Sequence, residues 1–238
     1  MTPEKLARRA RHSRLRHSIN RPEKGHLVKV VKGTSPQGPA LGSRARNQFH
    51  QFTGEQLFGH GAYIVEHFRE GQKIAEYECT NGITNEGLND ILDVMFDGGD
   101  QKTTWYAGLI DAVTGWSALA ATDTYDNINQ AGNGWDEFTN YTDANNGDNA
   151  TTRPEWPAGA PSAQSITNAT QAVYDITASG TIKGIFVVAG ETSQTKADHA
   201  PGTTPPNKLW STAAFASNVA VQNGDQLKVT YTVNASTT

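Results

Sequence analysis

Cysteine is almost absent from this chain of 238 residues, and it has no long apolar run. The single cysteine, Cys79, excludes an internal disulfide framework and a zinc site built from several cysteines. No stretch approaches the roughly 20 apolar residues that cross a bilayer, and no apolar signal core follows the basic N-terminus. We therefore expect no membrane segment and no secretory leader. An arginine-rich, acid-poor start is also typical of mitochondrial transit peptides, so composition alone leaves that alternative open.

Charged and aromatic residues are also scarce, at 18% and 8% of the chain. Glycine, serine, threonine, asparagine and alanine are abundant, which favours a β-rich scaffold with long surface connections over a helical bundle. Common catalytic motifs are missing: there is no Gly-x-Ser-x-Gly, no phosphate-binding Walker loop and no His-Glu-x-x-His. We therefore predict a protein that is not an enzyme and that uses no cofactor and no metal.

Positive charge is concentrated at the N-terminus. The first fifty residues hold twelve basic and two acidic side chains, a net charge of +10, and the remaining 188 hold eight basic and 22 acidic ones, a net charge of −14. A basic arm ahead of an acidic body indicates a segment that contacts nucleic acid, a membrane surface or an acidic protein. The candidate partner-binding residues of the arm are Arg8, Arg9, Arg11, Arg14, Arg16, Arg21, Lys24, Lys29, Lys32, Arg44 and Arg46.

Residues 1–46 are predicted to form this arm and a linker, and residues 47–238 a β-rich body. The apolar residues near the N-terminus do not share one helical face, so we expect the arm to become ordered only against a partner. Within the arm, the sequence LVKVV (residues 27–31) is a short strand-like run. The GTSPQGP sequence at residues 33–39 follows it and is typical of a linker.

The body is predicted to be mainly β. A hairpin is expected first, with strands at residues 62–69 and 73–79 joined by Glu70-Gly71-Gln72. Further strands are expected at residues 104–110, 172–177, 181–189, 209–215 and 226–234. Short β-favouring runs separated by turn residues predict a β-sandwich of the jelly-roll or immunoglobulin-like type.

One amphipathic helix is expected after the hairpin. Thr84 is placed to cap its N-terminus, and Gly98-Gly99 to end it. We expect its apolar stripe to pack against the sheet, with Leu92 in the middle. The stripe recurs at i, i+3, i+4, i+7 and i+8, and consists of Leu88, Ile91, Leu92, Met95 and Phe96.

Residues 111–171 are rich in Asp, Asn, Gly, Thr, Ala and Pro, and are expected to form a long connection. We expect its aromatic residues to anchor it to the sheet. They are Trp116, Trp135, Phe138, Tyr141 and Trp156.

The remaining polar residues favour structural interpretations. His67 lies on a predicted strand, and Cys79 has no recognisable base, so we expect both to be structural. The Asp/Asn-rich residues 143–148 lack the spacing of a calcium loop and are expected to form a solvated loop tip. Four carboxylates on predicted strands are expected to face solvent. They are Glu76, Glu78, Asp136 and Glu137.

The arm is the strongest functional signal. Its arginines are able to neutralise several phosphates in a salt-sensitive, sequence-independent way. They are equally suited to an acidic surface on a neighbouring subunit, and both alternatives stay open. No aromatic residue is interleaved with residues 8–16, so base stacking on single strands is not expected.

Five segments of the body together resemble a small structural protein of tailed-bacteriophage particles. The resemblance spans roughly residues 60–235 and leaves out the arm. It implies a non-enzymatic virion component, present in many copies and assembled in the bacterial cytoplasm, which argues against a transit peptide. The segments are ITNEGLNDIL (83–92), TWYAGLI (104–110), GWDEF (134–138), RPEW (153–156) and GDQLKVTYTV (224–233).

Two structural roles fit this resemblance. The first is a capsid decoration or cement subunit, and the alternative is a component of the tail, neck or fibre base. In either role, the partners of the chain would be other virion proteins, either the major capsid protein or tail and neck subunits. Further copies of this chain are expected to join it in a homo-oligomer, and packaged DNA would be a non-specific contact. No membrane partner is expected. A third alternative, a carbohydrate-binding module, depends on Trp116, Trp135 and Trp156 offering exposed ring faces.

Overall fold

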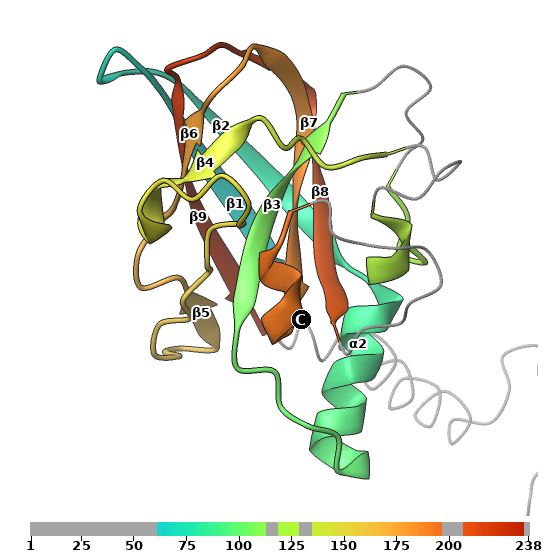
Figure 1. The fold of residues 1–238 in the computed structure, drawn as a ribbon. Helices are drawn as coiled ribbons and strands as arrows, with labels where there is room; N and C mark the ends of the chain where they lie inside the picture. The colour runs from blue at the N-terminus through green and yellow to red at the C-terminus, as the bar shows by residue number, and fades with distance from the viewer. Residues whose placement is uncertain (1–60, 113–118, 129–134, 197–206, 236–238) are drawn as a thin grey trace, which may run out of the picture. The chain divides into compact units, whose positions relative to one another are not determined.

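A computed structural model describes residues 61–112, 119–128, 135–196 and 207–235 (Figure 1). The eleven candidate partner-binding residues of the arm, the strand-like run and the linker lie outside the described residues, as does Trp116. None of the helices in the described ranges has the length and apolar character needed to cross a membrane.

The described chain is mainly β, with one short α-helix. The helix α2 (Asn85–Leu92) continues into a π-helical turn, η1 (Asp93–Asp97). Three 3₁₀ turns are η2 (Tyr125–Asn127), η3 (Ala144–Asn146) and η4 (Glu191–Gln194). The strands are β1 (Gly61–Arg69), β2 (Gln72–Ile83), β3 (Trp105–Asp111), β4 (Tyr141–Asp143), β5 (Ser165–Thr167), β6 (Ala172–Ile176), β7 (Gly180–Ala189), β8 (Lys208–Val221) and β9 (Gln226–Asn234).

The strands form one antiparallel sheet that curls into a half-barrel (Figure 1). Its order is β3-β7-β8-β2-β1-β9-β6-β4, and β5 pairs with β9 beside this path. The strand β2 joins the two halves, because residues 72–81 pair with β1 whereas Gly82 and Ile83 pair with β8. The prediction of a mainly β fold with one helix is therefore confirmed. The finer assignment to a jelly-roll or immunoglobulin-like sandwich stays a prediction.

The first hairpin forms where the sequence predicts it. Arg69 pairs with Gln72, so the connection is the two-residue turn Glu70-Gly71. Both residues have positive φ, 51° and 75°. Such a turn matches the right-handed twist of the flanking strands, and glycine adopts this conformation at little cost.

The core lies inside the curl and links strands that are not neighbours. The rings of Tyr63 on β1 and Tyr231 on β9 stack with centroids 4.1 Å apart. The hydroxyl of Tyr63 lies 2.6 Å from that of Ser211 on β8. Cys79 is buried beside them, and burial raises the pKa of its thiol to about 12. The prediction that Cys79 is a small buried residue is therefore confirmed.

The long connection covers the outer edge of β3. The backbone N–H of Ala107 donates to the carbonyl of Pro154 at 3.0 Å, and that of Phe138 donates to Leu109 at 2.8 Å. Four of the five aromatic residues proposed as anchors are buried: Trp135, Phe138, Tyr141 and Trp156. The connection therefore satisfies the groups of an otherwise open sheet edge. It also contains β4 and β5, two short strands that the sequence did not predict.

Candidate interaction surface

The N-terminal turn of α2 is fixed to strand β8. Thr84 caps the helix as predicted, since its Oγ1 accepts the backbone N–H of Gly87 at 3.0 Å. The carboxylate of Glu86 accepts the N–H of Leu209 at 2.7 Å and that of Tyr125 at 2.8 Å. A Cβ on Gly87 would lie 2.9 Å from the carbonyl oxygen of Trp210. Glycine at this position therefore allows the helix to approach the strand closely.

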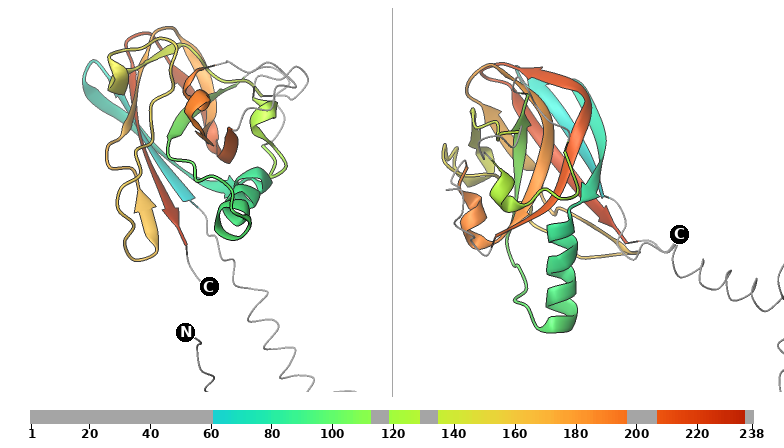
Figure 2. Two further views of the ribbon diagram at one scale, coloured as in Figure 1. Left: turned by 60° about the horizontal axis from the view of Figure 1, so that its bottom comes forward. Right: turned by 90° about the vertical axis from the view of Figure 1, so that its right-hand side faces the viewer.

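The far end of the helix leaves the sheet (Figure 2). Leu92 is 46% exposed, Met95 59% and Phe96 73%. The prediction that Leu92 lies in the middle of a buried stripe was therefore wrong. The helix continues past the end of the strands as a π-helical turn and ends at Gly98, whose φ is 80°. The last two turns consequently carry their apolar side chains beyond the part of the sheet that could cover them.

An apolar groove of about 390 Å³ lies between this helix and the end of the sheet. Its helical wall includes Ile91, Val94 and Met95, and the opposite wall includes Ile166 and Val233 from β5 and β9.

Three tryptophans also line the groove. The ring of Trp105 meets those of Trp156 and Trp210 edge-on, with centroids 6.4 Å and 5.4 Å away. Trp156 and Trp210 are themselves buried. The groove therefore has a rigid aromatic base, a kind of surface that binds apolar side chains well.

The helix that forms one wall of the groove is strongly acidic. Residues 85–102 contain five carboxylates and one lysine. The lysine, Lys102, lies 3.5 Å from Asp90 at the groove. Asp93, Asp97 and Asp100 are exposed, and none of the three forms an ion pair with another residue in the described part of the chain. The exposed surface around α2 and η1 thus combines apolar side chains with uncompensated negative charge.

Leu92→Asp is expected to leave the folded body intact. Surface substitutions away from buried features usually change stability by less than about 0.5 kcal/mol. The matched substitution Leu109→Asp would place a carboxylate in the core, where Leu109 is fully buried, and is expected to unfold the body. Thermal unfolding of the two variants checks this, and a large loss of melting temperature in Leu92→Asp would contradict the exposed position of the helix.

Two buried charge clusters lie elsewhere in the body. Arg153 forms a bidentate pair with Glu137, with Nε–Oε1 and Nη2–Oε2 distances of 2.8 and 2.7 Å. Glu137 is buried, so the prediction that it faces solvent was wrong, whereas Asp136 is exposed as expected. Burial alone would lower the pKa of Arg153, but the attraction of Glu137 raises it above its usual value.

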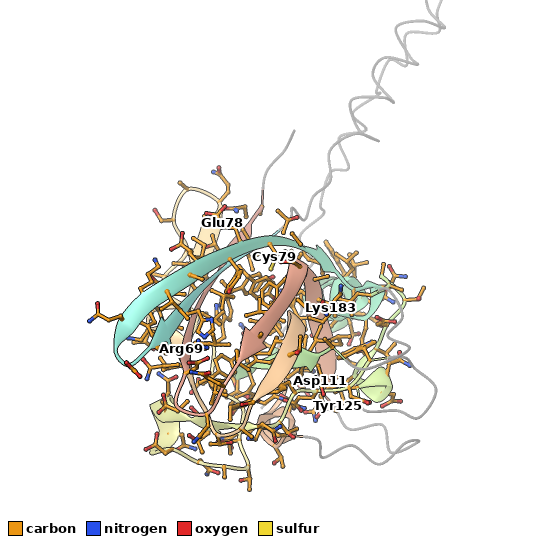
Figure 3. The ribbon with its side chains drawn as sticks, turned by 90° about the horizontal axis from the view of Figure 1, so that it is seen from above. Arg69, Glu78, Cys79, Asp111, Tyr125 and Lys183 are labelled. Carbon is orange, nitrogen blue, oxygen red and sulfur yellow. The ribbon has the colours of Figure 1, made fainter. Side chains whose placement is uncertain are left out.

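The second buried cluster is centred on Asp225, in the turn before β9. Its carboxylate accepts hydrogen bonds from the guanidinium of Arg69, at 2.7 and 2.8 Å, and lies 2.8 Å from Nε2 of His67. Arg69 is the last residue of β1, at the hairpin end of the strand (Figure 3). His67 is buried against this carboxylate, in accord with the structural role expected of it. The cluster therefore ties the hairpin to the last turn of the body.

The other carboxylates behave largely as the sequence predicts. Glu76 and Glu78 are exposed. In the Asp/Asn-rich loop, residues 145–148 are exposed, but Asp143 is buried and accepts the backbone N–H of Asn145 at 3.0 Å. Across the described ranges, no three His, Cys, Asp or Glu side chains are grouped so that they could hold a metal ion.

Comparison of the chain with protein-family models and with curated proteins finds no match.

The exposed groove brings together residues from α2, η1, β3, β5 and β9 and was not anticipated from the sequence. One signal was present: the acidic residues recur every three or four positions, from Glu86 to Asp97. This spacing places a carboxylate stripe along the helix.

Proposed function

We propose that this chain is a non-enzymatic structural subunit of a tailed-bacteriophage particle, a decoration or cement protein of the capsid. In this proposal a basic arm, residues 1–46, attaches a sandwich-like β body to its neighbours. The observation that carries the proposal is the division of charge, +10 in the first fifty residues and −14 in the rest. An arm of this kind attracts the phosphates of packaged DNA or an acidic capsid surface.

The placement of the segments that carry the resemblance supports the proposal. Residues 83–92 cap and form α2, residues 104–110 form most of β3, and residues 224–233 form the turn and most of β9. Residues 153–156 cover the edge of β3, with the N–H of Trp156 donating to the carbonyl of Trp105 at 2.7 Å. The resemblance therefore concerns the framework of the body rather than one surface loop.

The carbohydrate-binding alternative loses most of its basis. Trp135 and Trp156 are buried with 1% and 6% exposure, so they do not present open ring faces to a sugar. Trp116 lies outside the described residues.

Changing five arm residues, Arg8, Arg9, Arg11, Arg14 and Arg16, to glutamine is expected to lower the salt concentration at which the protein leaves purified particles. Each lost cation removes one salt-sensitive contact, because exposed charges are screened over about 10 Å at 0.1 M salt. The measurement is release of the protein across a salt series.

Arginine-to-lysine changes at the same five positions are the matched control, since they keep the charge and should release like the wild type. Identical release curves for the glutamine and wild-type proteins would contradict the electrostatic role of the arm. Copy number in the same particles tests the location: hundreds of copies are expected for a capsid decoration protein. A small multiple of three or six would instead mean a tail or neck component.

A further inference from the structure

We propose that the groove beside α2 binds residues 24–32 of the N-terminal arm of a second copy of this chain, so that neighbouring subunits are joined arm to body. This inference rests on the proposed function in one respect. A structural subunit present in many copies needs a contact between neighbouring subunits, and the arm in the groove would supply that contact.

The groove and the acidic surface beside it together select a partner that is both apolar and basic. The groove lining is apolar apart from Gln101 and the Asp90–Lys102 ion pair, whereas Asp93, Asp97 and Asp100 lie outside that lining. The groove walls expose apolar groups, and Met95 in the helical wall is 59% exposed. Phe96, which follows Met95 outside the groove lining, adds a further exposed apolar side chain. A second copy of the same helix would satisfy the apolar requirement. However, the helix and the residues that follow it (85–102) would bring five carboxylates and one lysine against an identical set. Like charges placed close together are unfavourable. Nucleic acid and anionic lipid are disfavoured for the same reason.

One segment of the chain outside the described residues has the required chemistry. Residues 24–32, KGHLVKVVK, combine four aliphatic side chains with three lysines and no acid. The aliphatic residues are Leu27, Val28, Val30 and Val31, the densest apolar run in the first 46 residues. A segment rich in β-branched residues favours an extended conformation, in which successive side chains point to opposite faces of the strand. Its aliphatic groups are suited to the tryptophan-lined groove, and its lysines to Asp93, Asp97 and Asp100.

The connection to the body is long enough to reach a neighbour. Residues 33–60 separate the segment from Gly61, the first residue of β1. Twenty-eight residues span up to about 90 Å when extended, whereas a folded body of this size has a radius of gyration of about 16 Å. Gly61 pairs with Val233, which lines the groove, so the chain enters the body beside this surface. The connection is therefore long enough for the arm of one copy to reach the groove of another.

This contact is heterologous, because the arm of one copy occupies the groove of the next. Such contacts generate closed rings or open chains of subunits rather than isologous dimers. Full-length protein is expected to associate at low salt and to dissociate as salt rises, since part of the attraction is between exposed charges.

A mixing experiment with two full-length variants tests the proposal. The first variant, Met95→Asp, blocks the groove and keeps the arm. The second, Val28→Asp with Val31→Asp, disrupts the arm and keeps the groove. Each variant alone is expected to remain monomeric in sedimentation velocity at concentrations where the wild type associates, with the dissociation constant raised at least about tenfold. An equimolar mixture is expected to form a complex of one copy of each.

Matched controls separate this effect from a general effect of new charge. Ile74 is 50% exposed on β2 and does not line the groove, so Ile74→Asp is expected to associate like the wild type. Ser35→Asp with Gln37→Asp makes the same charge change as the arm variant within the linker, and should also associate.

Three results would overturn the inference: a monomeric wild type at all concentrations, undiminished association of Met95→Asp, or a mixture that forms no complex. The particle-release experiment is independent of these results. If the mixture forms no complex while the protein still enters particles through its arginines, the arm-to-groove contact is wrong and the virion role stands. If the complex forms but the protein is absent from particles, the virion role is wrong.

Discussion

Replacing Arg153 with methionine is expected to destabilise the body by about 3–5 kcal/mol, because the carboxylate of Glu137 would then be buried without its counter-charge. The loss includes a further contact, since Nη1 of Arg153 donates to the carbonyl of Ser193 at 2.5 Å. The bond to Ser193 joins the connection that covers β3 to the turn after β7. Urea denaturation at neutral pH, followed by tryptophan fluorescence, measures the change in the free energy of unfolding.

The double variant Glu137→Gln with Arg153→Met is the control for this prediction. It removes both charges, so it should cost less than Arg153→Met alone, although a buried polar side chain remains. Tyr141 would keep a partner, because its hydroxyl, now 3.1 Å from Oε1 of Glu137, can donate to the amide oxygen. Equal losses in the single and double variants would mean that the uncompensated charge is not the cause.

The body is expected to lose stability below about pH 4 because of Asp225. Hydrogen bonds from Arg69 are the main reason that the pKa of this carboxyl lies well below its usual value, with smaller contributions from Gln222 and His67. The unfolded chain, with an ordinary pKa of about 3.9, therefore binds this proton more readily than the folded protein. The stabilisation is fully present above the unfolded pKa and is lost as the pH falls toward the folded one.

Asp225→Asn is expected to lose about 2–4 kcal/mol of stability at neutral pH and to flatten the fall on the acid side. The measurement is the free energy of unfolding of the wild type and the variant at neutral pH and near pH 3. Asp97→Asn, which alters an exposed carboxylate of the helix, is the matched control and should follow the wild type. An Asp225→Asn protein with the acid sensitivity of the wild type would contradict the role of this cluster.

Local features of the body could be predicted from the sequence because they depend on neighbours in the chain. The alternation of apolar and polar residues identified β9, and its predicted bounds, residues 226–234, are those observed. Thr84 caps α2 and Gly98 ends the helical segment, because cap chemistry acts within one turn. The charge division from which a partner-binding role is proposed for the arm is likewise a property of composition alone.

Only the tertiary structure decided which side chains are covered. The periodicity of Leu88 to Phe96 shows that a helix has an apolar face, but not whether a sheet extends far enough to bury it. The alternation around Glu137 could not reveal Arg153, sixteen residues further along, as its buried partner. The groove depends in the same way on Ile91, Trp105 and Val233 meeting at one end of the half-barrel. Periodicity records the environment along one element, whereas burial depends on contacts between elements distant in the chain.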